Sequence, residues 1–222
     1  MIKPDLISRS KRKTISIVIT SDAKVLVKAP LKISLNEINK FVYEKQNWIE
    51  SKLNIITQNR SQFDDVINYK KMLILGIKYD IYKSDNVKKI ALESDKLIVP
   101  SKYTNEKILE IVKKWYINFA NEIISNRYEE ISKHIKLKGK EVLINNTRGR
   151  WGACTSKGRI TFNFRIVMLP PKLIDYVIIH ELCHLVEMNH STKFWNLVSL
   201  FMPDFLQVRR QMKTYNFLLK LF

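Results

Sequence analysis

One eleven-residue segment constrains this chain more than any other. It contains the motif H-E-x-x-H, from His180 to His184, followed by a third histidine at His190. The chain has only four histidines, and three of them lie here. On a helix, residues four apart share one face, so His180 and His184 are predicted to be neighbours about 5–6 Å apart at Cβ. The chain must then turn back for His190 to join them.

This spacing suits a metal ion. Two imidazoles on one helical face can converge on a zinc ion with Zn–N bonds of about 2.0–2.1 Å, and three protein ligands leave one position open, as in catalytic zinc sites. Glu181 lies about 100° round the helix from His180, so it is poorly placed as a ligand. It is well placed to reach a water whose pKa zinc lowers from about 15.7 toward 7, and to act as a general acid/base.

The flanking residues indicate that this segment is a buried helix. Pro170-Pro171 precedes it, and proline is favoured at the first helical position. The run 173–179 is apolar on nearly every side, which is typical of a buried helix. Its β-branched end, 177–179, would also suit a strand, but length favours one helix of about 17 residues. We expect the helix to end after Met188, with Asn189 in the left-handed conformation.

Composition bounds the class of protein. The 222 residues suffice for one large domain or two small ones with a substantial core. Two cysteines, Cys154 and Cys183, give no disulfide framework and are expected to be small buried side chains. There is no apolar leader and no run of about 18 apolar residues that could span a bilayer. A soluble cytoplasmic protein that does not enter a membrane is the simplest interpretation.

The net charge of +18 raises the question of a nucleic-acid partner. Residues 1–140 carry 28 basic and 16 acidic side chains, and residues 141–222 carry 11 and 5, so the excess is spread evenly. Of the 39 basic residues, 29 are lysine, whereas arginine is the better reader of phosphate. The pattern favours a solvated basic surface over a localised polyanion site.

The rest of the chain predicts a mixture of strands and helices. The first part, 1–100, reads as a β-rich region, and 101–222 as the catalytic region, the two together forming one compact unit. Residues 34–37 form a capping box before a helix that extends to about residue 56. The expected strands and the long second helix cover residues 14–20, 25–29, 72–82, 88–92 and 96–99, and then 104–134.

Four of the five glycines lie between residues 139 and 158, which indicates tight turns or close backbone approach. We expect a loop and an edge strand here that line the active cleft. In this interpretation Arg150 faces an anionic group or a carbonyl, and Arg148, Trp151 and Asn163 are further candidates for contact with the substrate. The alternative is a plain β-hairpin with Trp151 packed inside. A strand at 159–164 could pair with an extended peptide.

Several of these stretches together resemble the YgjP-like (DUF45) family of metal-dependent hydrolases, which is related to the SprT-like zinc metallopeptidases. The matching stretches are residues 150–154, 175–185, 189–191 and 194–195. The resemblance implies an α+β, zincin-like fold, one Zn²⁺ ion held by His180, His184 and His190, and Glu181 as general acid/base. The ligand spacing equals that of metzincins, but Glu187 stands where they have glycine and no clear Met-turn is present.

Three functions follow from these patterns. The first is a zinc metallopeptidase acting on peptide bonds. The second is a metal-dependent nucleotide pyrophosphatase, since activity on UTP has been attributed to the family's namesake and Arg148, Arg150 and Arg159 would suit a triphosphate. The third is a basic nucleic-acid-binding protein with a structural metal, which would need a fourth protein ligand that the sequence does not clearly offer.

Overall fold

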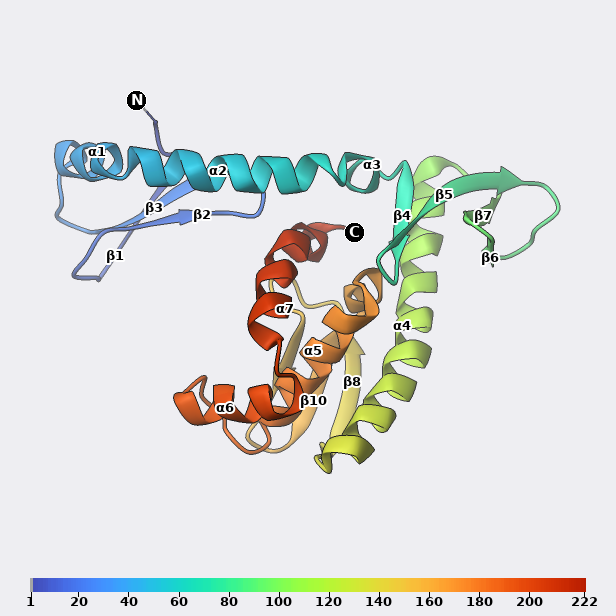
Figure 1. Cartoon of the computed structure of the whole chain (residues 1–222). Coiled ribbons are helices and arrows are strands. Elements are labelled where there is room, and N and C mark those ends of the chain that lie inside the picture. Colours follow the sequence, from blue (N-terminus) through green and yellow to red (C-terminus); the bar gives the residue numbers. More distant parts are fainter. Residues whose placement is uncertain (1) are drawn as a thin grey trace. The chain divides into compact units, whose positions relative to one another are not determined.

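The computed structural model describes residues 2–222 and combines helices with three β-sheets, so the expected α+β class is confirmed (Figure 1). The chain forms two compact units, the first ending at Asp64 and the second extending from Asp65 to Phe222. Within the described residues, no helix has both the length and the apolar character needed to cross a membrane.

Unit 1 is built on a three-stranded sheet in the order β1-β3-β2. Its strands are β1 (Leu6–Ser10), β2 (Ser16–Ile19) and β3 (Val25–Pro30). The predicted hairpin is confirmed, because β2 and β3 pair antiparallel. Strand β1 pairs parallel with β3, and sequence patterning did not indicate it because its side chains are mostly exposed.

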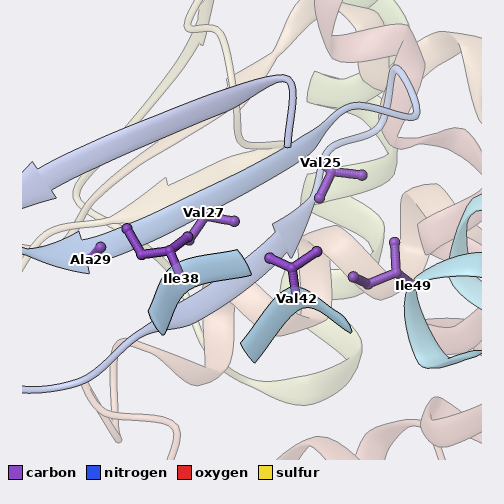
Figure 2. Packing of buried hydrophobic residues seen from close by; sticks show 6 residues of the cluster. All are labelled: Val25, Val27, Ala29, Ile38, Val42 and Ile49. Carbon is purple, nitrogen blue, oxygen red and sulfur yellow. The ribbon is translucent and has the colours of Figure 1, made fainter. Parts of the chain in front are cut away.

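Two helices cover this sheet: α1 (Leu35–Glu44) and α2 (Gln46–Ser61). The capping box is confirmed, since the Ser34 hydroxyl accepts from the Glu37 amide and the Glu37 carboxylate accepts from the Ser34 amide. The single helix expected here is divided at Lys45, which lies outside the helical conformation of both helices. Alternate residues of β3 meet the inner faces of both helices (Figure 2), and the buried cluster comprises Val25, Val27, Ala29, Ile38, Val42 and Ile49.

Unit 2 begins with a short helix and a four-stranded sheet in the order β4-β5-β7-β6. These elements are α3 (Asp64–Ile67), which spans the boundary, and β4 (Lys71–Ile74), β5 (Ile77–Ser84), β6 (Ala91–Glu93) and β7 (Lys96–Pro100). The run expected as one strand is a hairpin, whose turn residues Leu75 and Gly76 both have positive φ. A Cβ on Gly76 would lie 2.8 Å from Pro170 Cγ, so glycine is required where this turn approaches the start of the histidine-bearing helix.

Helix α4 (Asn105–Ile135) is the long helix that the sequence predicts, and the Thr104 hydroxyl caps it. The Tyr116 hydroxyl, on its buried face, donates to the Leu73 carbonyl of β4 at 2.9 Å. The first sheet of unit 2 therefore shares a core with α4. The expected division at residues 100/101 falls inside this unit, between β7 and α4.

The second sheet of unit 2 has the order β8-β10-β9, with β8 (Glu141–Asn145), β9 (Gly152–Cys154) and β10 (Arg159–Asn163). Strand β10 pairs parallel with β8 and antiparallel with β9, so it is the central strand and not the edge strand expected at 159–164. Phe164 already belongs to the following 3-10 helix, η1 (Phe164–Met168). The two edge strands of this sheet are β8 and β9.

The chain ends in α5 (Pro171–Cys183), α6 (Thr192–Phe201), α7 (Phe205–Met212) and the 3-10 helix η2 (Lys213–Lys220). Helix α5 is fixed to α4 by a bidentate ion pair, in which Arg127 donates to the two carboxylate oxygens of Asp175 at 2.6 and 2.7 Å. The Ser191 hydroxyl caps α6, as predicted. These helices bury Glu181 and His184 inside unit 2, whereas His190 stays exposed.

The stability of unit 1 depends on its small core, and Ile38 is fully buried in it. We expect Ile38→Ala to lower the free energy of opening of unit 1 by about 2–4 kcal/mol, because it leaves a cavity. Ile55 is 47% exposed, and Ile55→Ala should change that free energy by less than about 0.5 kcal/mol. Hydrogen exchange measured by mass spectrometry over residues 25–53 reads the opening directly. Equal effects of the two substitutions would contradict this packing.

Candidate metal centre

Helix α5 carries most of the H-E-x-x-H motif and is largely buried. Pro171 occupies its first turn, as predicted, and most of its remaining residues are buried. The helix spans 13 residues instead of the expected 17, because it ends at Cys183 with His184 as the C-cap residue. The His184 amide still donates to the His180 carbonyl, so both side chains keep the spacing of one helical turn.

The three histidines converge. The ring centroids are 4.9 Å apart for His180 and His184, 4.9 Å for His180 and His190, and 4.8 Å for His184 and His190. The Nε2 atoms of His180 and His190 are 3.0 Å apart, and one ligand nitrogen from each of the three residues lies within 4.8 Å of the others. The turn from helix α5 to His190 therefore does what the spacing predicts.

The turn itself differs from the expectation. Asn189 is not among the residues with positive φ, and the chain reverses earlier, where the amides of Val186 and Glu187 both donate to the Cys183 carbonyl. No described residue between 184 and 191 has a positive φ. A glycine is therefore not needed at Glu187, which accounts for the departure from the metzincin pattern.

The surroundings of His180 and His190 favour their neutral imidazole form. Burial, followed by the charges of His184 and His190, lowers the pKa of His180 to about 3, and burial also lowers that of His190. Neutral imidazole is the form that binds metal. His184 Nδ1 lies 3.0 Å from the Glu187 carbonyl, so an Nδ1–H there leaves the Nε2 lone pair for a ligand.

The residues fit a zinc ion. In a tetrahedral site with Zn–N bonds of about 2.0–2.1 Å, ligand nitrogens lie about 3.3 Å apart, close to the spacing seen between His180 and His190. Two neutral lone pairs at that distance repel each other unless a cation or a proton lies between them. No other described histidine, cysteine, aspartate or glutamate joins this group, so it offers three protein ligands.

Glu181 is buried beside these histidines, and its Oε2 has no hydrogen-bond partner among the described residues. Burial raises its pKa to about 8, and the nearby charge of Arg150 opposes the rise. A bound cation would oppose it further, since opposite charge favours the carboxylate. A Cβ on Gly152 would lie 2.7 Å from both Cγ and Oε1 of Glu181, so the glycine of β9 creates the space that this carboxylate occupies.

An aromatic layer from α6 supports the histidines. The Phe194 ring stacks on His184 with centroids 4.4 Å apart, and the Trp195 ring stacks on His190 at 5.4 Å. The Arg209 guanidinium lies over the Trp195 ring at 4.4 Å. Sequence reasoning did not single out Arg209. The sequence shows the pair of arginines in α7, but only the fold shows that this helix packs beside Trp195 and that Arg209 contacts its ring.

Three of the four predicted substrate contacts, Arg148, Arg150 and Trp151, lie in the loop between β8 and β9, and the fourth, Asn163, is the last residue of β10. Arg148 and Arg150 are exposed, and the charge of Arg150 acts on Glu181. Trp151 is only 9% exposed and donates its Nε1–H to Asn216 Oδ1 at 3.1 Å, in agreement with the packed alternative. The Trp151 ring is therefore packed inside, and its contact with a substrate stays a prediction.

Asn163 is also interior, at 1% exposure. Its side-chain amide donates to the carbonyls of Thr147 and Arg150, and its Oδ1 accepts from the Arg165 amide. Asn163 therefore holds the loop that carries Arg150 and has no free amide group to offer a substrate.

Neither cysteine joins the three histidines. Cys183 is buried, and burial raises the pKa of its thiol to about 12. Cys154, on β9, is half-buried, and burial followed by the charge of Glu181 raises its pKa to about 11. Neither sulfur belongs to the group of ligand atoms that the three histidines form.

Comparison with known proteins identifies the family of this chain. The family model described as "YgjP-like, metallopeptidase domain" matches residues 13–215. Among solved structures, the chain is similar to the metallopeptidase zymogen abylysin of Pyrococcus abyssi, with 23% identity and a TM-score of 0.38 over 41% of this chain and 92% of that one. No curated protein matches. Since the family model spans nearly the whole sequence, the chain belongs to the YgjP-like family of metallopeptidase domains.

Proposed function

We propose that this protein is a zinc-dependent peptidase with His180, His184 and His190 as the metal ligands and Glu181 as the general acid/base. The observation that supports it most is the arrangement of Glu181, a buried carboxylate without a hydrogen-bond partner, beside three converging imidazoles. The family match supports metal-dependent hydrolysis in general. The finer assignment of metal, residues and substrate rests on the geometry.

The chemistry divides between the ion and the chain. A zinc ion at three imidazoles supplies Lewis acidity at an open position. Glu181 accepts a proton from the attacking water on a carboxylate oxygen and then delivers it to the nitrogen of the leaving amine. Burial of Glu181 favours this return, because a desolvated carboxylate holds a proton more readily than one in water, while the charges of Arg150 and of a bound cation favour the carboxylate that first accepts the proton.

Strand β9 favours a peptide as the substrate. It is one of the two edge strands of its sheet, the other being β8, and among residues 2–222 no strand pairs with its outer side. Its first residue, Gly152, touches Glu181. An extended peptide added to this edge would gain backbone hydrogen bonds and carry its peptide bonds past the carboxylate. Arg150, exposed at the start of β9, would contact a carbonyl or carboxylate of that peptide.

The nucleotide alternative has less support. Of the three arginines that would suit a triphosphate, Arg159 is engaged in an ion pair with Glu141 across β8 and β10. The nucleic-acid alternative requires a closed metal site, whereas the described histidine group has three members. A peptide uses both the edge strand and the open ligand position, so it is the better match.

The role of Glu181 can be tested by Glu181→Gln, which keeps the shape of the side chain but removes its proton affinity. We expect the rate of peptide cleavage by the zinc-loaded protein to fall by about 10²–10⁴-fold with zinc content unchanged. Assays use β-casein and UTP in parallel, with metal content measured by mass spectrometry. Glu122→Gln, on the exposed face of α4, is the matched control.

Two results would contradict the proposal. Cleavage that persists in Glu181→Gln would remove the carboxylate from the mechanism. Release of pyrophosphate from UTP that depends on Glu181, without any peptide cleavage, would select the nucleotide alternative.

The contact between β9 and Glu181 makes a second prediction. Gly152→Ala places a methyl group where Glu181 Cγ and Oε1 now lie, so the carboxylate must move. We expect kcat to fall by about tenfold or more, because small misplacements of a catalytic group are costly. Ala153→Val, whose side chain lies on the opposite face of the strand, should leave kcat nearly unchanged. Equal kcat values for wild type and Gly152→Ala would show that this contact does not position Glu181.

A further inference from the structure

Arg209 is a cation without an acidic partner next to the histidine cluster. It lies on α7 and is exposed, and its guanidinium rests 4.4 Å over the Trp195 ring. Among the described residues this ring contact is its one specific interaction, with no hydrogen bond or ion pair. Its five N–H groups are therefore available to a ligand.

The Trp195 indole connects this guanidinium to the metal centre. The same ring stacks on His190 at 5.4 Å and lies 5.9 Å from His180. Phe205, one turn before Arg209 on α7, stacks on the indole at 5.5 Å with the planes 10° apart. The guanidinium thus rests on a ring that is fixed both by α7 and by a histidine of the site.

Charge effects agree with this position. The charge of Arg209 contributes to lowering the pKa of His180 and of His190, after burial and the neighbouring histidines. Two acidic groups on nearby helices have other partners, since Asp204 binds Lys172 and Asp175 binds Arg127. The carboxylate within the site is that of Glu181, and the charge that lowers its pKa is that of Arg150.

The length of each peptide residue determines which positions of a substrate Arg209 could reach. An extended peptide advances about 3.3–3.6 Å per residue, so one or two residues span the width of the indole beside His190. A guanidinium held over an aromatic ring is preorganised for two parallel hydrogen bonds to a carboxylate. A neutral side chain would gain much less from this group.

We propose that Arg209 is a specificity-determining residue, which binds an aspartate or glutamate side chain of the peptide substrate within two residues of the scissile bond. This inference rests on the proposed peptidase function. It assigns the substrate class, acidic peptides, from the position of a single unpaired guanidinium at the His190 side of the site.

The test uses matched peptides that differ only in carrying Glu or Gln at each of the two positions on either side of the cleaved bond. Zinc-loaded wild type should prefer Glu at one position by about tenfold in kcat/KM at low salt, as expected for a charge-assisted hydrogen bond. Arg209→Gln should abolish this preference with little change for the Gln peptide. Arg209→Glu should favour Lys at the same position.

Arg210→Gln is the control, because Arg210 is equally exposed and adjacent on α7. Binding provides a readout independent of turnover. Fluorescence anisotropy of the labelled Glu and Gln peptides on zinc-loaded Glu181→Gln should show the same tenfold difference, lost when Arg209→Gln is added. UTP binding, measured with the same pair of variants, detects a phosphate ligand in place of a carboxylate.

The outcomes separate the two claims. Peptide cleavage that depends on Glu181 but shows the same Glu preference in Arg209→Gln would overturn the role of Arg209 and leave the peptidase proposal standing. An equal loss for Glu and Gln peptides would make Arg209 only a support for Trp195. Arg209-dependent binding of UTP without a preference for acidic peptides would also overturn the inference.

Discussion

Helix α5 carries two imidazoles and a carboxylate through an apolar interior, and burying these polar groups is the cost that the rest of unit 2 must offset. Unpaired buried polar groups are strongly unfavourable. His180 Nδ1 and Glu181 Oε2 nevertheless have no partners among the described residues. Such a site persists because its surroundings over-determine it, and a bound cation would relieve part of the cost.

Specific contacts hold helix α5 and the loop that carries Arg150 in place. The α5 helix is tied to α4 through Arg127 and Asp175, and its start is held against the tight turn at Gly76. On the other side, fully buried Arg165 donates to the Leu221 carbonyl and to Asn146 Oδ1, which joins η1 to the loop after β8. Burial lowers the pKa of Arg165 to about 10, so this cation also depends on its carbonyl partners. The loop carrying Arg150 is therefore held from the interior, which helps to keep its position beside Glu181.

The histidine cluster was predictable from the sequence because helical periodicity is a local property and because three of the four histidines lie within eleven residues. The capping box at Ser34, the long helix after Thr104 and the cap at Ser191 were predictable for the same reason. Interactions between distant segments were not. The pairing of β1 with β3, the central place of β10 and the position of Arg209 over Trp195 each join residues that no local pattern connects. Asn163 shows the converse, since its place in a strand expected to line the cleft suggested a binding role, whereas tertiary hydrogen bonds place its side chain inside.

The central claim, an open site with three imidazole ligands, is tested most directly by zinc K-edge X-ray absorption of the zinc-loaded protein. We expect the zinc to be coordinated by three imidazole nitrogens and one further oxygen at about 2.0–2.1 Å, with no sulfur. His190→Ala should remove one imidazole, whereas His134→Ala, in the exposed last turn of α4, should leave the spectrum unchanged. A sulfur scatterer at about 2.3 Å would bring Cys154 or Cys183 into the site, and this result, or four protein ligands, would contradict the open centre.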